Sequence, residues 1–173
     1  MSFAVPTVET QRLRLRGAKL SDLEAYAAFR ASERVRFMGG PNDRDEAFSD
    51  LCYGLGQWAM RGYGLWVVAD KSTDEPLGYT GLYHPEYWAD REISWAVFES
   101  AAGKGVATEA ARAVRDFAYD RLGWDTVISA IIPGNEPSIA LAKRLGATLD
   151  GKYEHPKIGE MLIYRHVTPE SRT

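Results

Sequence analysis

The feature that most constrains the fold is the glycine turn Gly103-Lys104-Gly105, where the hydrophobic period of the chain changes. Before the turn, Glu92-Ile93-Ser94-Trp95-Ala96-Val97 has the composition of a strand. After it, apolar residues recur at helical spacing, at Val106, Ala110, Ala113, Val114, Phe117 and Ala118. The chain is therefore expected to run from a strand, through glycines, into the N-terminus of a helix.

Such a turn is a candidate anion site. The first backbone N–H groups of a helix have no internal partner, and the helix dipole is positive there. Glycine lacks the Cβ that would hold a phosphate away from the backbone. The turn is not a dinucleotide fingerprint, because the third glycine is absent, and no Gly-Lys-Ser/Thr marks a P-loop. A bare strand-to-helix connection is the alternative, and Lys104 either adds charge or is simply solvated.

The rest of the chain alternates short apolar segments with turn residues. Strands are expected at 11–16, 65–69, 77–83, 92–97, 126–132, 147–152 and 160–167. Helices are expected after Ser21-Asp22, over Arg44 to Arg61, after Gly105, and from Asn135 to Leu145. Phe48, Leu51, Leu55 and Trp58 form the apolar face expected for the second helix. This order predicts one mixed α/β domain over residues 1–173, built around one sheet.

Composition excludes several classes of protein. The net charge is −3 and the basic residues are scattered, so nothing indicates a nucleic-acid partner or an anionic membrane surface. No apolar stretch approaches the ~20 residues that span a bilayer, and no signal peptide is visible. The one cysteine, Cys52, rules out an internal disulfide and a paired-cysteine metal site. We expect a cytoplasmic protein without a metal, with Cys52 buried as a small apolar residue.

The segment from Glu92 to Gly146 resembles the GNAT superfamily of N-acetyltransferases. The acetyl-CoA signature of that family is Gln/Arg-x-x-Gly-x-Gly/Ala, and this chain has Ala102-Gly103-Lys104-Gly105-Val106-Ala107. Ala102 departs from the signature, which removes one side chain but leaves the backbone cradle. Asn135-Glu136-Pro137-Ser138 with Leu145-Gly146, and the opening Glu9 to Arg16, look like the ribosomal-protein N-acetyltransferase branch. The resemblance implies the GNAT fold, one central, mostly antiparallel sheet flanked by helices.

The resemblance also implies how acetyl-CoA is held. The strand at Ser94 to Val97, with Trp95, Ala96 and Val97, would bind the pantetheine arm through its main chain. The pyrophosphate would lie against Gly103, Lys104, Gly105, Val106, Ala107 and Thr108. Asn135 and Ser138 would contact the pantetheine and thiol end, and Lys143 or Arg144 the adenosine phosphates. Each has a structural alternative: Asn135 as an N-cap, Ser138 as a small packing residue, and the two cations as partners of the helix dipole.

Acetyl transfer to an amine requires a base, because most alkyl amines are protonated at neutral pH. Glu92 is the candidate, at the start of the strand beside the expected thioester site; a surface glutamate is the alternative. His84 is the reserve base. Many superfamily members carry a tyrosine acid seven residues after the helix asparagine, but this chain has Ala142 there. Ser138 is therefore the candidate donor to the departing thiolate, with the amine attacking the thioester directly.

The acceptor is open at this point. In GNAT proteins, the loop corresponding to Phe37-Met38-Gly39-Gly40-Pro41 usually lines the acceptor groove, and His84 to Asp90 would form the other wall. Aromatic and acidic residues there suit a cationic amine. Three readings compete: acetylation of a protein N-terminus, acetylation of a small amine such as an amino acid, polyamine or drug, and a CoA-binding module without catalysis. The resemblance also allows a homodimer.

Overall fold

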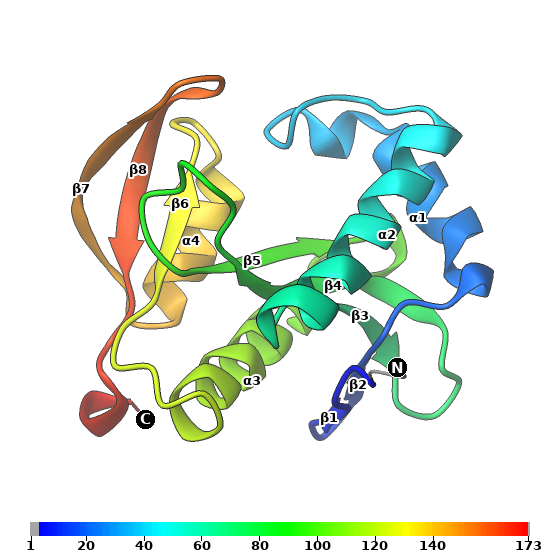
Figure 1. The fold of residues 1–173 in the computed structure, drawn as a ribbon, viewed down its shortest axis with the longest axis horizontal. Coiled ribbons are helices and arrows are strands. Elements are labelled where there is room, and N and C mark those ends of the chain that lie inside the picture. The colour runs from blue at the N-terminus through cyan, green and yellow to red at the C-terminus, as the bar shows by residue number, and fades with distance from the viewer. Residues whose placement is uncertain (1–3, 173) are drawn as a thin grey trace.

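The computed structural model describes residues 4–172, so positions 1–3 and 173 of the expected domain lie outside the described residues. The strands are β1 Val8–Glu9, β2 Leu13–Arg16, β3 Leu65–Asp70, β4 Pro76–Tyr83, β5 Glu92–Val97, β6 Ile128–Ile131, β7 Thr148–His155 and β8 Gly159–Arg165 (Figure 1). The α-helices are α1 Leu23–Arg30, α2 Arg44–Arg61, α3 Val106–Asp120 and α4 Glu136–Arg144. The element order is the expected one, with short β1 added at the start.

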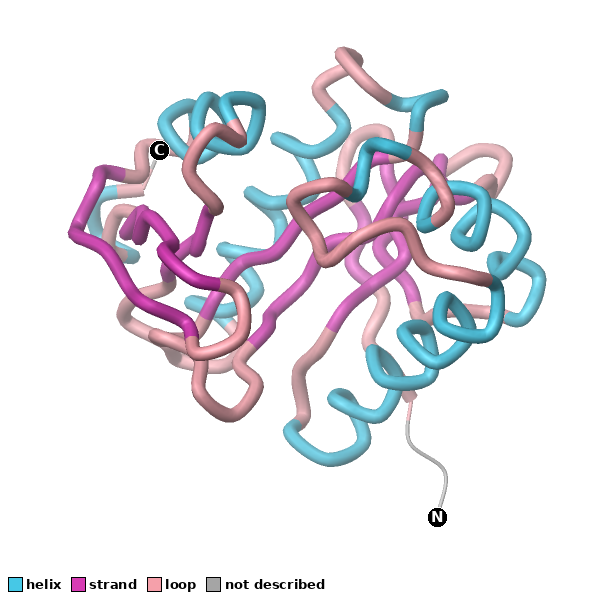
Figure 2. Tube along the Cα trace, turned by 90° about the horizontal axis from the view of Figure 1, so that it is seen from above, coloured by secondary structure: helices cyan, strands magenta, loops and turns pink. Residues whose placement is uncertain are grey.

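The strands form one sheet in the order β1-β2-β3-β4-β5-β6-β8-β7. All neighbours are antiparallel except β5 and β6, which are parallel and pair only at Glu92↔Ile128. The strands therefore separate into two groups beyond that pair, as the view from above shows (Figure 2). The sheet is mixed and mostly antiparallel, as the sequence predicts.

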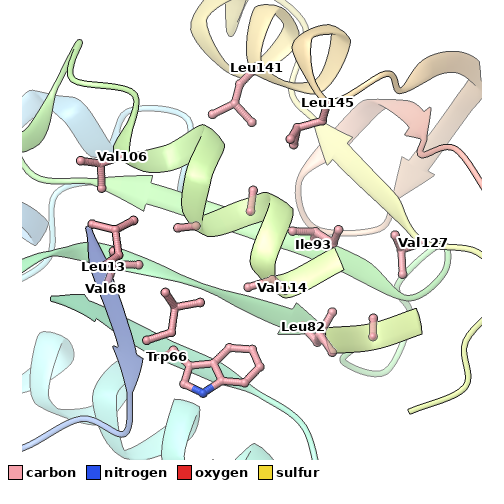
Figure 3. Close-up of a cluster of buried hydrophobic side chains, with 14 of the residues drawn as sticks. Leu13, Trp66, Val68, Leu82, Ile93, Val106, Val114, Val127, Leu141 and Leu145 are labelled. Atoms are coloured by element: carbon pink, nitrogen blue, oxygen red, sulfur yellow. The ribbon is translucent and has the colours of Figure 1, made fainter. Parts of the chain in front are cut away.

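Helix α3 builds the main core. Its apolar stripe, including Val106 and Val114, packs against side chains from β2 to β5, among them Trp66, Val68 and Leu82 (Figure 3). Burial of each such side chain stabilises the fold by about 1.5–3 kcal/mol. The same stripe fixes where α3 begins, and therefore where the glycine turn lies.

The other face of the sheet is covered by α1 and the start of α2. Tyr26 and Phe29 of α1 pack against Tyr79 of β4, with ring centroids 5.4 and 6.0 Å apart. Phe98, just after β5, lies 5.2 Å from Phe29. These contacts hold the segment between α1 and α2 close to the end of β5.

One expectation about α2 is wrong and another is confirmed only in part. Cys52 is exposed instead of buried. On the expected apolar face, Trp58 is buried and Leu51 packs against the core, but Phe48 is 47% exposed, and Ala47 and Gly54 are buried instead. The buried face is rotated because small residues let the helix approach the sheet closely: a Cβ on Gly54 would lie 3.6 Å from the Cβ of Leu65. Large apolar residues alone do not reveal such a face.

Candidate functional site

The divergence of β5 from β6 opens a cavity between β5 and α4. Helix α4 lies across this opening, and Trp95 Nε1–H of β5 donates to Ser138 Oγ of α4 at 3.3 Å. The structure brings several of the expected donor-site residues to this cavity of about 260 Å³, namely Trp95, Ala96, Val97, Ala107, Asn135 and Ser138. The edge of β5 beyond Glu92 thus faces a space instead of a neighbouring strand.

The glycine turn forms the N-terminus of α3. Gly103 (φ 72°) and Gly105 (φ 76°) both adopt the left-handed conformation, which residues with a Cβ rarely adopt, and Gly105 is the N-cap. A Cβ on Gly103 would meet nothing within 4 Å. The first-turn N–H groups of α3 lack intrahelical partners by geometry. This turn can hold an anion through its backbone.

Two arginines support the turn. Arg12 Nη1 donates to the carbonyl of Lys104 at 3.0 Å, and its Nε pairs with Glu109 at 2.7 Å. Arg144, at the end of α4, donates to Thr108 Oγ1 at 3.2 Å.

The groove beside the turn is lined by Gly103, Gly105, Val106, Ala107, Thr108 and Arg144. The exposed side chains of Lys104 and Lys143 do not line it. No sequence motif identifies Arg12 as part of the turn, because it lies just before β2 and 92 residues before Lys104.

Glu92 is buried and not a surface glutamate. Only 6% of it is exposed, and burial raises the pKa of its carboxyl to about 8. Two hydrogen bonds act in the opposite direction on this pKa: Trp88 Nε1–H donates to Oε2, and the main-chain N–H of Ala130 also donates to the carboxylate. Glu92 lines a cavity of about 500 Å³ that also contains Ser94, Trp95 and Ser138. The candidate base Glu92 and the candidate hydrogen-bond donor Ser138 therefore line the same cavity.

Asn135 and Ser138 also have structural roles. The Asn135 side chain accepts from the Ser138 N–H at 3.4 Å, so Asn135 caps α4. Both residues still line the cavities on either side of Trp95. Ala142, in the position of the absent tyrosine, is fully buried against Ile131 and Tyr164.

The walls expected for the acceptor are only partly present. Phe37, Met38 and Gly39 line the Glu92 cavity, together with Tyr83 and Trp88. The reserve base His84 does not line it. Glu86 pairs with Arg61, and Tyr87 is 77% exposed.

The described residues, 4–172, also bear on metal binding and on membrane spanning. In this range, no group of three or more His, Cys, Asp or Glu side chains is arranged to hold a metal ion. Over the same residues, every helix is too short or too polar to cross a bilayer.

The raised pKa of Glu92 predicts a pH-dependent stability. Between its ordinary value of 4.5 and about 8, the unfolded chain has lost this proton and the folded chain keeps it, so stability falls as pH rises. Glu92→Gln should remove this loss, on the order of a few kcal/mol by pH 8.5, while changing stability little at pH 4. Urea unfolding of both proteins across this range measures the difference. A constant difference would show that the carboxyl titrates normally.

A family model and several known proteins are similar to this chain. Residues 12–148 match the family model described as "Acetyltransferase (GNAT) domain". The crystal structure of an acetyltransferase from Agrobacterium tumefaciens is 35% identical, with a TM-score of 0.87, covering 96% of this chain and 97% of that one. YkkB from Bacillus subtilis, an uncharacterized protein, is 36% identical over 50% of this chain and 52% of its own length. The microcin self-immunity acetyltransferase MccE, solved in complex with acetyl-CoA and AMP, shares the fold at 18% identity (TM-score 0.76, covering 91% of this chain and 93% of that one).

Proposed function

We propose that this chain, which belongs to the GNAT acetyltransferase domain family, moves the acetyl group of acetyl-CoA to a primary amine. In this proposal the amine attacks the thioester directly. We propose that residues 1–173 form one domain that carries this activity. The observation that carries the proposal is that Glu92 and Ser138 line one cavity, which meets the β5 edge and the glycine turn through Trp95 and Ala107.

The donor site suits acetyl-CoA in three respects. The backbone N–H groups at the start of α3 suit a pyrophosphate, with Arg12 and Arg144 adding positive charge nearby. The open edge of β5 from Ser94 to Val97 offers main-chain groups to the amides of a pantetheine arm. MccE shows that this fold accepts acetyl-CoA in another protein. Acetyl-CoA would supply the activated acetyl group.

The side chains then have separate roles. Glu92, in its ionised form, would accept a proton from the attacking ammonium or amine, while the hydrogen bonds from Trp88 and from the Ala130 N–H hold the carboxylate in place. Ser138 Oγ–H would donate toward the departing sulfur. Trp95 Nε1–H, which donates to the same Oγ, orients that hydroxyl and leaves its proton free to point into the cavity. Cys52 is on α2 and lines neither cavity, so we propose direct attack by the amine without an acetyl group on this cysteine.

Thiol release from acetyl-CoA across a panel of amines and peptides tests the proposal. Release with at least one acceptor supports an acetyltransferase, and peptides would favour protein N-termini over small amines. Measurable acetyl-CoA binding without release on any acceptor would instead make the chain a CoA-binding module. A covalent acetyl group on Cys52 that turned over at the catalytic rate would contradict direct attack.

Ser138→Ala should lower kcat by about 10- to 100-fold, because the departing thiolate loses a hydrogen-bond donor. The Km for acetyl-CoA should change less than threefold, since the hydroxyl is one of many donor contacts. Steady-state rates with an acceptor from the panel measure both quantities. Ser49→Ala, in α2 and outside both cavities, is the control. An unchanged kcat would leave Ser138 as a packing residue.

A further inference from the structure

We propose that the acceptor amine carries an anionic group, a carboxylate or a phosphate, which Arg36 and Lys157 bind on opposite walls of the Glu92 cavity. This inference rests on the proposed function and narrows its substrate class. Neither cation is at the glycine turn, where we propose that the phosphates of acetyl-CoA bind.

The two cations come from distant parts of the chain. Arg36 lies in the segment between α1 and α2, and Lys157 lies in the turn between β7 and β8. In Figure 1 this segment and the tip of the β7–β8 hairpin lie on either side of the space above β5. Both residues line the cavity that has Glu92 in its wall. A small molecule beside Glu92 is therefore flanked by two positive charges.

Nearby basic residues are paired within the protein, whereas these two are not. Arg34 pairs with Glu99 at 2.8 Å and Lys152 pairs with Glu160 at 2.8 Å. The Arg36 guanidinium lies 4.9 Å from the ring of Phe37, and within residues 4–172 neither it nor the ammonium of Lys157 forms an ion pair. Two exposed, unpaired cations that face one cavity are available to a ligand.

The cavity also lacks acidic groups to offset them. Among the described residues that line it, Glu92 is the one carboxylic acid, and burial keeps much of it protonated at neutral pH. An amine with no anionic group would meet net positive charge there. An amine with a carboxylate or phosphate gains charge-assisted hydrogen bonds from the two cations.

Matched acceptor pairs test this substrate class. O-phosphoethanolamine is compared with ethanolamine, and alanine with alaninamide, by thiol release from acetyl-CoA. We expect a lower Km for the anionic member of at least one pair. Lys157→Ala should raise that Km by about tenfold, the loss expected for one hydrogen bond to a charged group, and leave the Km of the member without an anionic group unchanged. Lys157→Arg should retain the preference. If neither pair shows a lower Km for its anionic member, the inference is overturned.

Controls separate the anion site from the donor site and from folding. Arg36 also borders the donor cavity, so Arg36→Ala is read together with the Km for acetyl-CoA, which should stay within threefold. Arg44→Ala removes an exposed arginine that pairs with Glu24 outside the cavity and should change neither preference. An equal effect of Arg44→Ala would indicate only the net charge of the protein and would contradict the site.

A binding measurement keeps this inference distinct from the proposed function. Calorimetry of the CoA-loaded protein with both members of each acceptor pair requires no turnover. Tighter binding of the anionic member of a pair, lost in Lys157→Ala, supports the anion site even if no amine is acetylated. Equal binding within both pairs overturns the anion site even if an amine is acetylated.

Discussion

Glu92→Gln is expected to lower kcat/Km for acetyl transfer by about 100-fold or more, the range typical of a general base. The amide keeps the shape of the side chain and the donor bond from Trp88, but it cannot take a proton. With a pKa of about 8, the ionised form of Glu92 is the minority at pH 7. The wild-type rate should therefore rise with pH through about 8. In Glu92→Gln the inflection near pH 8 should be absent and only the rise from deprotonation of the acceptor amine should remain, as initial rates from pH 6 to 9.5 will show.

The matched control is Glu86→Gln. Glu86 precedes Glu92 by six residues, is exposed, and pairs with Arg61 outside the cavity. Its rate and pH profile should match the wild type. If Glu92→Gln keeps both the wild-type rate and the rise near pH 8, another group or water is the base. Unfolding curves of the same variant show whether a loss of activity reflects chemistry or folding.

Gly81→Ala is expected to destabilise the fold by about 3 kcal/mol or more and to reduce the yield of folded protein. A Cβ at this position of β4 would lie 2.2 Å from the carbonyl oxygen of Gly64 and 2.6 Å from the Cα of Leu65. Both contacts are backbone atoms, so no side chain can move aside. The strand would have to shift away from β3, and it also pairs with Glu92 through Tyr83. The melting temperature and the rate of acetyl transfer should therefore both fall.

Gly56→Ala is the control for this prediction. Gly56 lies inside α2, and a Cβ there meets nothing within 4 Å. Alanine should stabilise a helix interior by about 0.5–1 kcal/mol relative to glycine, so the melting temperature should rise. If Gly81→Ala melted like Gly56→Ala, the close approach of β3 and β4 would not be a constraint.

Local signals predicted much of the fold. Helix α2 begins and ends as expected because Asp43 and Glu46 form a capping box and Gly62 ends the helix in the left-handed conformation. The glycine turn predicted the start of α3 for the same reason: its conformational requirement is local. The exposure of Phe48 on α2 was not predicted, because the centre of the buried face depends on how closely Gly54 approaches Leu65, which hydrophobic periodicity does not contain.

The candidate site was predictable only as far as motifs extend. Glu92, Asn135 and Ser138 were identified from their places in a pattern, and the structure puts all three around Trp95. The placement of Arg36 and Lys157 in the wall of the same cavity depends on loops that are far apart in the sequence. Contacts of this kind arise from tertiary packing, and the sequence carries no short-range signal for them.

The single pair that joins β5 to β6 has a consequence for cohesion. A continuous ladder would tie the two halves of the sheet with hydrogen bonds supplied entirely by the chain, but here the ladder stops after Glu92↔Ile128. Under the proposed function, the amides of the bound donor would act as the missing rungs on the β5 side, while its other face packs on α4. The ligand would then supply part of the interaction between the two halves of the sheet, so tighter binding of acetyl-CoA would also make the sheet more rigid.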